Sequence, residues 1–372
     1  MKCQRLLLLN LGTTSFKFQL CDFRNGMVER IGGDGSYRLR LPSGTLKGPC
    51  RCRNCTEAFE LCIRLMREED VLSSLEELDA VGFKAVHGGP LSGTRLVDEE
   101  LLQAMEQFVP YAPAHNPVYL ELMRNLRERY PALCQAVRFE TSFHADIPAF
   151  RTAYGIPWQW AEEWGIRRYG FHGSSHEYIA GRMQELEPDA KRVISIHLGG
   201  SSSLCAIRDG KSIASSMGAT PQTGLFQNNR VGDFDVCCLP ELVRRCGSLE
   251  RVMEILCTQS GFLGLSGVSN DLREVLDARE AGDPRADLAV RAFVDQIVGY
   301  IGMFAAYLGG LVLREMVCEG LALFRPRLLE DTGYRGEDRR ISTADSGISI
   351  WVIQTNEEQV LARHIRALLL AL

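Results

Sequence analysis

Two segments of the chain share one pattern of apolar and polar positions. Residues 6–20 consist of an apolar run, a turn of small residues and a second apolar run, and residues 193–207 repeat that order. Each segment predicts a buried strand, a tight turn and a second strand. Backbone N–H groups and hydroxyls in such turns hold anionic oxygens, and glycine lets the backbone approach them closely. One such hairpin is ordinary, but two of them, one opening each half of the chain, predict a duplicated domain with a phosphoryl group held between the copies.

The rest of the pattern alternates helical and strand periodicities. We expect helices near 56–67, 98–109, 116–129 and 284–310, strands near 80–86, 136–139 and 348–353, and a helix at the C-terminal end. Strands followed by helices within each half are typical of an α/β protein.

Composition and charge narrow the class of protein. A chain of 372 residues is long enough for two domains. Its net charge of −5 gives no electrostatic reason to expect nucleic acid or an anionic membrane as a partner. No uninterrupted apolar run approaches the ~20 residues of a membrane span, and the first residues predict a strand rather than a signal peptide. We therefore expect a cytoplasmic protein.

The chain contains 13 cysteines, an odd number that favours reduced thiols. Cys50, Cys52 and Cys55 lie close together and could bind zinc or iron, but a structural site normally needs a fourth ligand. We expect reactive surface thiols there instead, and we expect Cys62, inside a helical pattern, to face the core.

Short motifs run through almost the whole chain in a fixed order. They span Asn10–Lys17, Phe83–Gly89, Ala112–Pro117, Phe139–His144, Ile166–His176, Ser216–Pro221, Arg230–Asp233, Gly264–Arg273 and Thr355–Glu358. In these motifs the chain resembles the acetate kinases, with their propionate and butyrate kinase relatives, in the sugar kinase–actin-like superfamily. The segment Ile166–His176 is close to identical to the signature of that family.

The resemblance implies an α/β protein with a duplicated, two-domain sugar kinase–actin-like (ribonuclease H-like) fold and a central interdomain cleft. Residues 1–148 with 358–372 would form the first domain, which carries the acyl substrate and a phosphate loop. Residues 149–357 would form the second, with the nucleotide side and the dimer interface. The implied reaction is direct in-line transfer of a phosphoryl group between ATP and acetate or propionate, with Mg²⁺, in a homodimer. Such transfer mainly requires two positioned anions and neutralised charge, which agrees with the paired hairpins.

The resemblance also implies roles for individual residues. The catalytic residues would be His172, Arg230, Glu140 and His115. The acyl substrate would contact Lys84, Val86, Ala114, Phe171 and Pro221. Phosphate and nucleotide would contact Lys17, Thr13, Ser15, His197, Gly199, Gly200, Asp271 and Arg273. Asn10 and Glu357 would hold Mg²⁺, which favours oxygen ligands.

Two of these residues have a clear chemical task. Arg230 would grip the carboxylate or the phosphoryl oxygens through its planar guanidinium. His172 would donate a hydrogen bond to the charge that develops on the transferring group. His172 and His176, four residues apart, could instead be a metal pair, but the small residues between them favour a turn into a helix.

The chain departs from the family pattern at several positions. Lys84 replaces an arginine, which keeps the charge but loses the bidentate fork, so we expect a weaker grip on substrate. Glu140 replaces an aspartate and is one methylene longer, and Gly200 and Ala214 also differ. After Gly310, roughly fifteen residues, judged from motif spacing, are missing. They include the Gly-Gly-Ile-Gly-Glu-Asn nucleotide loop, so we expect one strand of the second domain and one wall of the adenosine pocket to be lost.

Three functions therefore remain open. The first is an acyl kinase that uses ATP, and the second is an acyl kinase that uses pyrophosphate. The third is a degenerate homologue that binds acyl phosphate without catalysis. Because Ala114 stands where the family usually has leucine, we expect a wider acyl pocket and use of propionate at least as good as that of acetate.

Overall fold

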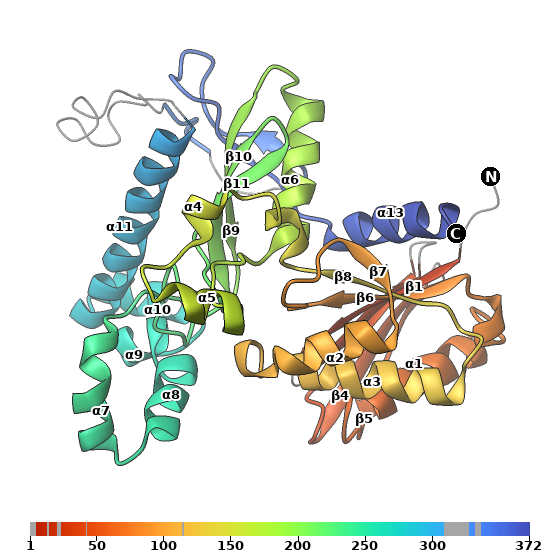
Figure 1. The fold of residues 1–372 in the computed structure, drawn as a ribbon. Helices are drawn as coiled ribbons and strands as arrows, with labels where there is room; N and C mark the ends of the chain where they lie inside the picture. Colours follow the sequence, from red (N-terminus) through yellow and green to blue (C-terminus); the bar gives the residue numbers. More distant parts are fainter. Residues whose placement is uncertain are drawn as a thin grey trace. The chain divides into compact units, whose positions relative to one another are not determined.

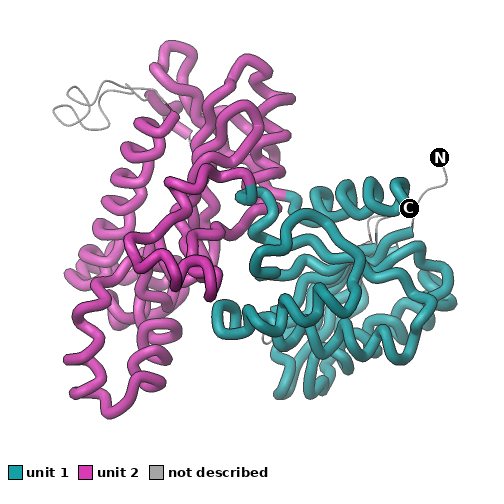
Figure 2. The backbone as a smooth tube through the Cα atoms, in the orientation of Figure 1, with its two compact units in different colours: residues 1–145, 356–372 teal, residues 146–355 magenta. Residues whose placement is uncertain are grey.

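The chain forms two compact units, which Figure 2 colours separately. Unit 1 comprises residues 1–145 and 356–372, and unit 2 comprises residues 146–355. The computed structural model describes residues 5–12, 15–20, 24–41, 43–113, 115–308, 327–331 and 336–372.

Unit 1 is built on a sheet that has eight strands in the described part of the chain (Figure 1). Their order in space is β5 (Gly44–Cys50), β4 (Gly35–Leu41), β3 (Arg24–Glu29), β2 (Ser15–Leu20), β1 (Leu6–Leu11), β6 (Ala80–Ala85), β8 (Gln135–Phe139) and β7 (Thr94–Leu96). β1 and β2 form the first predicted hairpin, with Asn10 opposite Lys17. β1, β6 and β8 run parallel, so their carboxyl ends lie at the same edge of the sheet.

Helices of unit 1 cover the sheet and explain the apolar run in β1. They are α1 (Cys55–Glu68), α2 (Glu99–Gln107), α3 (Asn116–Arg129) and α13 (Glu357–Leu370). Leu7 and Leu9 belong to a core cluster that includes buried residues of α1 and α3. Leu6 and Leu8 point to the opposite face and pack in a second cluster with Ile365 of α13. Because side chains alternate along a strand, a strand covered on both faces needs apolar residues at every position.

Unit 2 has a narrower sheet. In the described residues its order is β11 (Lys211–Ser215), β10 (Ser202–Arg208) and β9 (Arg192–Leu198), and β9 with β10 forms the second predicted hairpin. A separate pair joins β12 (Arg339–Arg340) to β13 (Trp351–Val352), so the strand expected at 348–353 is shorter than predicted. The helices are α4 (Ala149–Thr152), α5 (Trp158–Trp164), α6 (Gly173–Leu186), α7 (Leu239–Cys246), α8 (Leu249–Thr258), α9 (Gly261–Ser266), α10 (Leu272–Glu280) and α11 (Pro284–Tyr307).

Helix α11 is the longest of these helices and an unusually apolar one. Phe293 and Phe304 on it pack in the core of unit 2 with Leu204 of β10. Among the described helices, α11 alone is long and apolar enough to span a membrane, with a mean hydropathy of 1.4 over its best 18-residue window. Only 22% of that window is buried, and side chains such as Leu288 and Val294 are exposed. Packing against β10 and the neighbouring helices accounts for part of this apolarity.

The contact between α13 and the sheet of unit 1 gives a stability prediction. A Cβ at Gly82 of β6 would lie 2.1 Å from Ile365 Cδ1 and 3.0 Å from Leu8 Cδ2. We expect Gly82→Ala to lower the free energy of unfolding by about 1–3 kcal/mol, because it overpacks this contact. Ile365→Val removes the Cδ1 methyl and alone should cost about 1 kcal/mol. In urea unfolding, the double variant should lose less free energy of unfolding than the two single variants lose in sum. Strict additivity of the two losses would contradict the packing described.

Candidate active site

Three charged side chains of unit 1 meet where β6 and β8 end and α13 begins. Lys84 Nζ lies 3.6 Å from Glu140 Oε1 and donates a hydrogen bond to a carboxylate oxygen of Glu357. All three side chains are largely buried, with exposed fractions of 11%, 7% and 15%. Burial alone would lower the pKa of Lys84, but the two carboxylates outweigh burial and hold that pKa above its usual value. The structure therefore places predicted catalytic, substrate and metal residues in one cluster, the Lys84 cluster, with a net charge of −1.

Tyr119 of α3 contacts the backbone of Lys84, and sequence analysis assigned it no role. Its hydroxyl accepts a hydrogen bond from the backbone N–H of Leu11 at 2.9 Å and donates one to the carbonyl oxygen of Lys84. Its side chain is fully buried, and burial raises its pKa, so the phenol keeps its proton. Tyr119 thus ties the end of β1 to the end of β6. A tyrosine on the buried face of an amphipathic helix was the available signal, because a buried hydroxyl needs a partner.

The first hairpin turn lies beside the same strand ends. Its turn is closed by a hydrogen bond from Gly12 N–H to the carbonyl oxygen of Ser15 at 2.8 Å. Asn10 is half-buried and Lys17, opposite it on β2, is exposed. Thr13 lies outside the described residues.

His115 lies at the start of α3, in a short turn. Its backbone N–H donates to Ala112 at 3.0 Å, and the next residue, Asn116, is the first of the helix, as predicted. The buried Asn116 side chain donates to the carbonyl oxygen of His87 at 2.9 Å. The turn that carries His115 is therefore fixed to the loop after β6. Ala114 lies outside the described residues.

In unit 2, three histidines and the serines beside them form one group joined by hydrogen bonds and ring stacking, the histidine cluster. His172 and His197 stack, with ring centres 4.1 Å apart and planes inclined by 24°. Ser203 Oγ lies 2.8 Å from His172 Nδ1 and 2.9 Å from His176 Nε2. Ser175 Oγ lies 2.8 Å from His197 Nδ1. The cluster therefore joins the start of α6 to both strands of the second hairpin.

The backbone at His172 adopts an uncommon conformation. Its φ of 57° and ψ of 29° are left-handed, and it is the N-cap residue of α6, as the turn-into-helix prediction required. A non-glycine residue pays a conformational penalty there, and such residues gather at functional sites. His176, one helical turn later, is completely buried, and its ring nitrogens form hydrogen bonds with Ser195 and Ser203. It is therefore linked to His172 through Ser203.

Arg230 has neutral hydrogen-bond partners in unit 2. Its Nη1 donates to the carbonyl oxygen of Pro221 and to Gln227 Oε1, both at 3.3 Å. Burial lowers the pKa of this guanidinium, although arginine remains charged. Ser201 Oγ donates to the same Gln227 oxygen at 2.7 Å and so connects Arg230 to the turn that contains Gly199. Sequence reasoning missed Gln227, whose only signal is its place between Pro221 and Arg230.

The other predicted binding residues have varied surroundings. Val86 is half-buried against the core of unit 1, and Phe171 is buried in unit 2. Asp271 caps α10 by accepting from the backbone N–H of Arg273 at 2.9 Å. The hydrogen bonds from the Arg273 side chain and backbone lower the pKa of Asp271 to about 2. The structure therefore gives these two residues a helix-capping ion pair, whereas nucleotide contact stays a prediction.

The expectation of reactive surface thiols is wrong for Cys52 and Cys55. Both are buried, and burial raises their pKa values to about 11 and about 12. Thiols with such values hold little thiolate at neutral pH and are poor nucleophiles. Cys62 is fully buried, as predicted. No group of three or more His, Cys, Asp or Glu side chains that could hold a metal ion occurs in the described residues.

Comparison with known proteins identifies the family. Residues 5–363 match the profile of the Acetokinase family. The chain belongs to the acetokinase family. It is 38% identical to the acetate kinase of Dictyoglomus thermophilum, covering 97% of this chain and 98% of that one. It is 34% identical to the acetate kinase of Clostridium novyi, covering 97% and 98%.

Solved structures of the acetokinase family share the fold. The crystal structure of Porphyromonas gingivalis acetate kinase superimposes with a TM-score of 0.86 at 31% identity, covering 99% of this chain and all of that chain. A propionate kinase from Francisella tularensis gives the same TM-score at 29% identity, covering 97% and 99%. The predicted α/β fold class of the duplicated actin-like type is therefore confirmed.

Residues of unit 1 fit a magnesium ion. Mg²⁺ prefers oxygen ligands and is usually held by one or two carboxylates together with phosphates and water. Leu9 of β1 pairs with Phe83 of β6, so Asn10 and Lys84 follow at the same level of adjacent strands. Asn10, Glu140 and Glu357 thus supply amide and carboxylate oxygens near one edge of the sheet. The net negative charge of the Lys84 cluster favours a cation there.

The Lys84 cluster gives a pH prediction. In Lys84→Met, Glu140 and Glu357 would stay buried as like charges, so the folded-state pKa of one would rise above the usual ~4.3. The variant would keep its stability at pH values below that usual pKa and would lose stability as the pH rises above it. We expect the variant to lose about 3–5 kcal/mol relative to wild type at pH 8, and much less near pH 4.

Urea unfolding at several pH values measures this loss. The matched control is Lys84→Met combined with Glu140→Gln, which removes one carboxylate and should flatten the pH dependence. An equal loss at both pH values would mean that Lys84 contributes packing rather than charge.

Proposed function

We propose that this member of the acetokinase family is an acyl kinase that transfers a phosphoryl group between ATP and a short-chain carboxylate, acetate or propionate. The observation that carries the proposal is the setting of Arg230. It is a half-buried cation whose hydrogen bonds go to two neutral oxygens, and burial already lowers its pKa. A cation in such surroundings gains most from an anionic ligand. A carboxylate or a phosphoryl group supplies that anion.

The histidine cluster supports the same reaction. In the forward direction a carboxylate oxygen of the acyl substrate attacks the γ-phosphorus of ATP, and the bond from that phosphorus to ADP breaks. Charge spreads over the transferring oxygens, and fixed N–H donors stabilise it. The ring of His172 is held by Ser203 and by stacking on His197, so it is oriented before substrate binds. We assign His172 the role of donor and His197 that of its support.

Residues of unit 1 would serve the metal and the acyl group. Mg²⁺, held by Asn10 and Glu357, would neutralise phosphate charge. Glu140 would accept hydrogen bonds beside this metal site, and His115 would orient the substrate. Lys84 would attract the carboxylate, although its ion pairs with Glu140 and Glu357 leave it less available than an open cation. Val86, Phe171, Pro221 and Ala114 remain the proposed acyl pocket.

The turns of both hairpins would hold phosphate oxygens, with Lys17, Thr13 and Ser15 in the first. At the second turn, a Cβ at Gly199 or Gly200 would meet its nearest neighbour at 3.4 Å or 3.7 Å, an ordinary contact. Packing of the fold therefore does not require glycine at either position. Close approach of a ligand to the backbone gives a reason for both glycines.

The missing nucleotide loop is also part of this proposal. The alignment with the D. thermophilum enzyme extends over 393 residues, more than the 372 of this chain, so it contains positions without a counterpart here. In unit 1, β1 has β2 on one side and the parallel β6 on the other. In the described part of unit 2, β9 has only β10 beside it, and its Leu198 side chain is 61% exposed. Both observations are consistent with a lost strand, although the point of the deletion, after Gly310, lies outside the described residues.

We further propose that residues 1–148 with 358–372 and residues 149–357 are the two copies of the duplicated domain. The exposed apolar side chains Leu288 and Val294 of α11 favour a homodimer that covers them. The cysteines that the structure describes are all free, which favours the reducing cytoplasm.

Removal of either side chain that is proposed to donate hydrogen bonds to the transferring phosphoryl group gives the first kinetic prediction. Arg230→Ala and His172→Ala should each lower kcat by about 10²-fold or more, the usual cost of losing one transition-state donor. A coupled assay with acetate, propionate and ATP measures this. Arg251→Ala on α8, an exposed arginine paired with Glu254, is the matched control and should keep full activity. Unchanged turnover in Arg230→Ala would remove that residue from the mechanism.

Loss of one wall of the adenosine pocket gives the second kinetic prediction. If the nucleotide loop is absent, base recognition should be weak, so ATP, GTP and ITP should give kcat/KM values within about threefold of one another. Calorimetry should likewise find weak binding of ADP. Tight, adenine-selective binding would mean that another element replaces the wall. Turnover with pyrophosphate but not with any nucleotide would favour the pyrophosphate-dependent alternative.

A further inference from the structure

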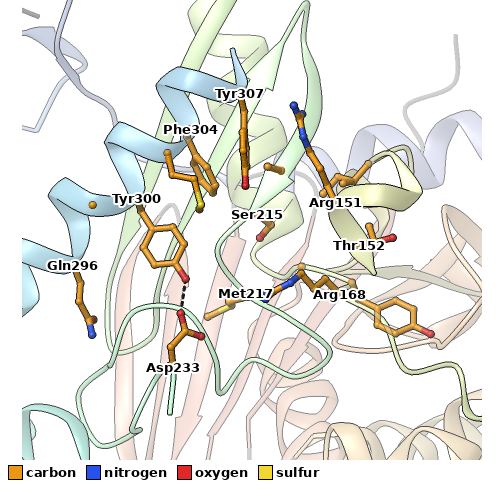
Figure 3. Close-up of a pocket in the computed structure, with 16 residues that line it drawn as sticks. Arg151, Thr152, Arg168, Ser215, Met217, Asp233, Gln296, Tyr300, Phe304 and Tyr307 are labelled. Atoms are coloured by element: carbon orange, nitrogen blue, oxygen red, sulfur yellow. Dashed lines mark hydrogen bonds between the residues drawn. The ribbon is translucent and has the colours of Figure 1, made fainter. Parts of the chain in front are cut away.

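Unit 2 contains a cavity that none of the predicted site residues lines. Its volume is about 470 Å³, within the range of about 300–1,000 Å³ that is typical of small-molecule sites. Figure 3 shows Arg151 of α4 and Arg168, from the loop before α6, on one side of it. Tyr300, Phe304 and Tyr307 of α11 form the other side.

The two arginines are held by neutral groups. One guanidinium N–H of Arg151 donates to the carbonyl oxygen of Ile213 at 3.1 Å, and the guanidinium lies 4.5 Å from the ring centre of Tyr307. The guanidinium of Arg168 lies 4.6 Å from the ring centre of Tyr154. Neither arginine forms an ion pair within the part of the chain that the structure describes. Aromatic rings orient a guanidinium without neutralising it, so both charges remain available to an anion.

The carboxylate that lines the cavity is already hydrogen-bonded on both oxygens. Asp233 Oδ2 accepts from the Tyr300 hydroxyl at 2.7 Å, and Oδ1 accepts from the backbone N–H of Gly224 at 2.9 Å. Burial, together with the Asp233 charge, raises the pKa of Tyr300, which keeps the phenolic proton in this bond. Two arginines and one occupied carboxylate therefore line the cavity, and the charges of these three side chains sum to +1.

We propose that this cavity binds a small organic dianion of the dicarboxylate class. A guanidinium pairs with a carboxylate through two parallel hydrogen bonds, so two arginines suit a ligand with two carboxylates. Met217, Met303 and Phe304 line the same cavity and provide apolar surface for the carbon chain between them. The site is separate from the proposed kinase residues, but Tyr169 and Gly170, which also line it, lead directly to His172.

Calorimetric titration with succinate tests the proposal. The full-length protein is used without ATP or acetate and in an Arg230→Ala background, so that succinate at the proposed acyl site is not counted. We expect saturable binding of one succinate per chain. Arg151→Met and Arg168→Met should each weaken it at least about tenfold, because each removes a charge-assisted pair. Asp233→Asn should tighten it, because it removes a negative charge from the wall, and the surface control Arg251→Met should leave it unchanged.

Two results would overturn the proposal. The first is the absence of saturable binding of succinate, including the case in which inorganic phosphate, which has the charge without a carbon chain, binds instead. The second is binding of succinate that Arg151→Met does not weaken. If succinate does not bind and Arg151→Met changes the sedimentation mass instead, a second copy of the chain occupies the cavity. Because no kinase substrate is present, failure of the proposed kinase activity would not affect these outcomes.

Discussion

Burial of one ammonium group between two carboxylates is the interaction on which unit 1 depends. Lys84 comes from the end of β6, Glu140 from the end of β8 and Glu357 from the start of α13. A buried cation is stable only when opposite charges compensate for its lost hydration, so the ends of β6 and β8 and the start of α13 must meet at one place. The contact of α13 with the far face of β1 and β6 follows from this constraint, because Glu357 begins that helix. The Lys84–Glu357 ion pair, which joins α13 to β6, thus consists of residues that are also expected to bind substrate and metal.

Unit 2 solves the opposite problem. The roles proposed for its cations and hydrogen-bond donors require that they stay available to anions, and the structure orients them with neutral groups. Arg230 is held by a carbonyl and an amide oxygen, and His172 by a hydroxyl and a stacked ring. Arg151 is likewise held by a carbonyl oxygen and an aromatic ring. Neutral partners fix geometry and leave the charge for a ligand, which is the arrangement that electrostatic stabilisation of phosphoryl transfer requires.

Local patterns in the sequence predicted much of the fold. Both hairpins follow from apolar runs around small turn residues, and the start of α3 follows from Asn116-Pro117, because these signals act within a few residues. Contacts between distant residues carried no such signal. Lys84 and Glu357 are separated by 273 positions, and nothing local indicates that they pair. The role of Tyr119 depends on the distance between two strand ends, which only the assembled sheet sets. The site residues themselves came from motif resemblance, and their surroundings came from the structure.

The two hairpins also differ in the number of strands beside them within the described residues. β1 is braced on both sides by β2 and β6, so strand pairing alone fixes the level of Asn10. In the described residues, β9 is braced on one side only, and a strand with a free edge twists and shifts more easily. Ser195 on β9 and Ser203 on β10 both bond to His176, which is buried on α6. This helix-to-strand network takes over part of the bracing, and it explains why a histidine with no proposed contact to substrate lies at the centre of the group that orients His172.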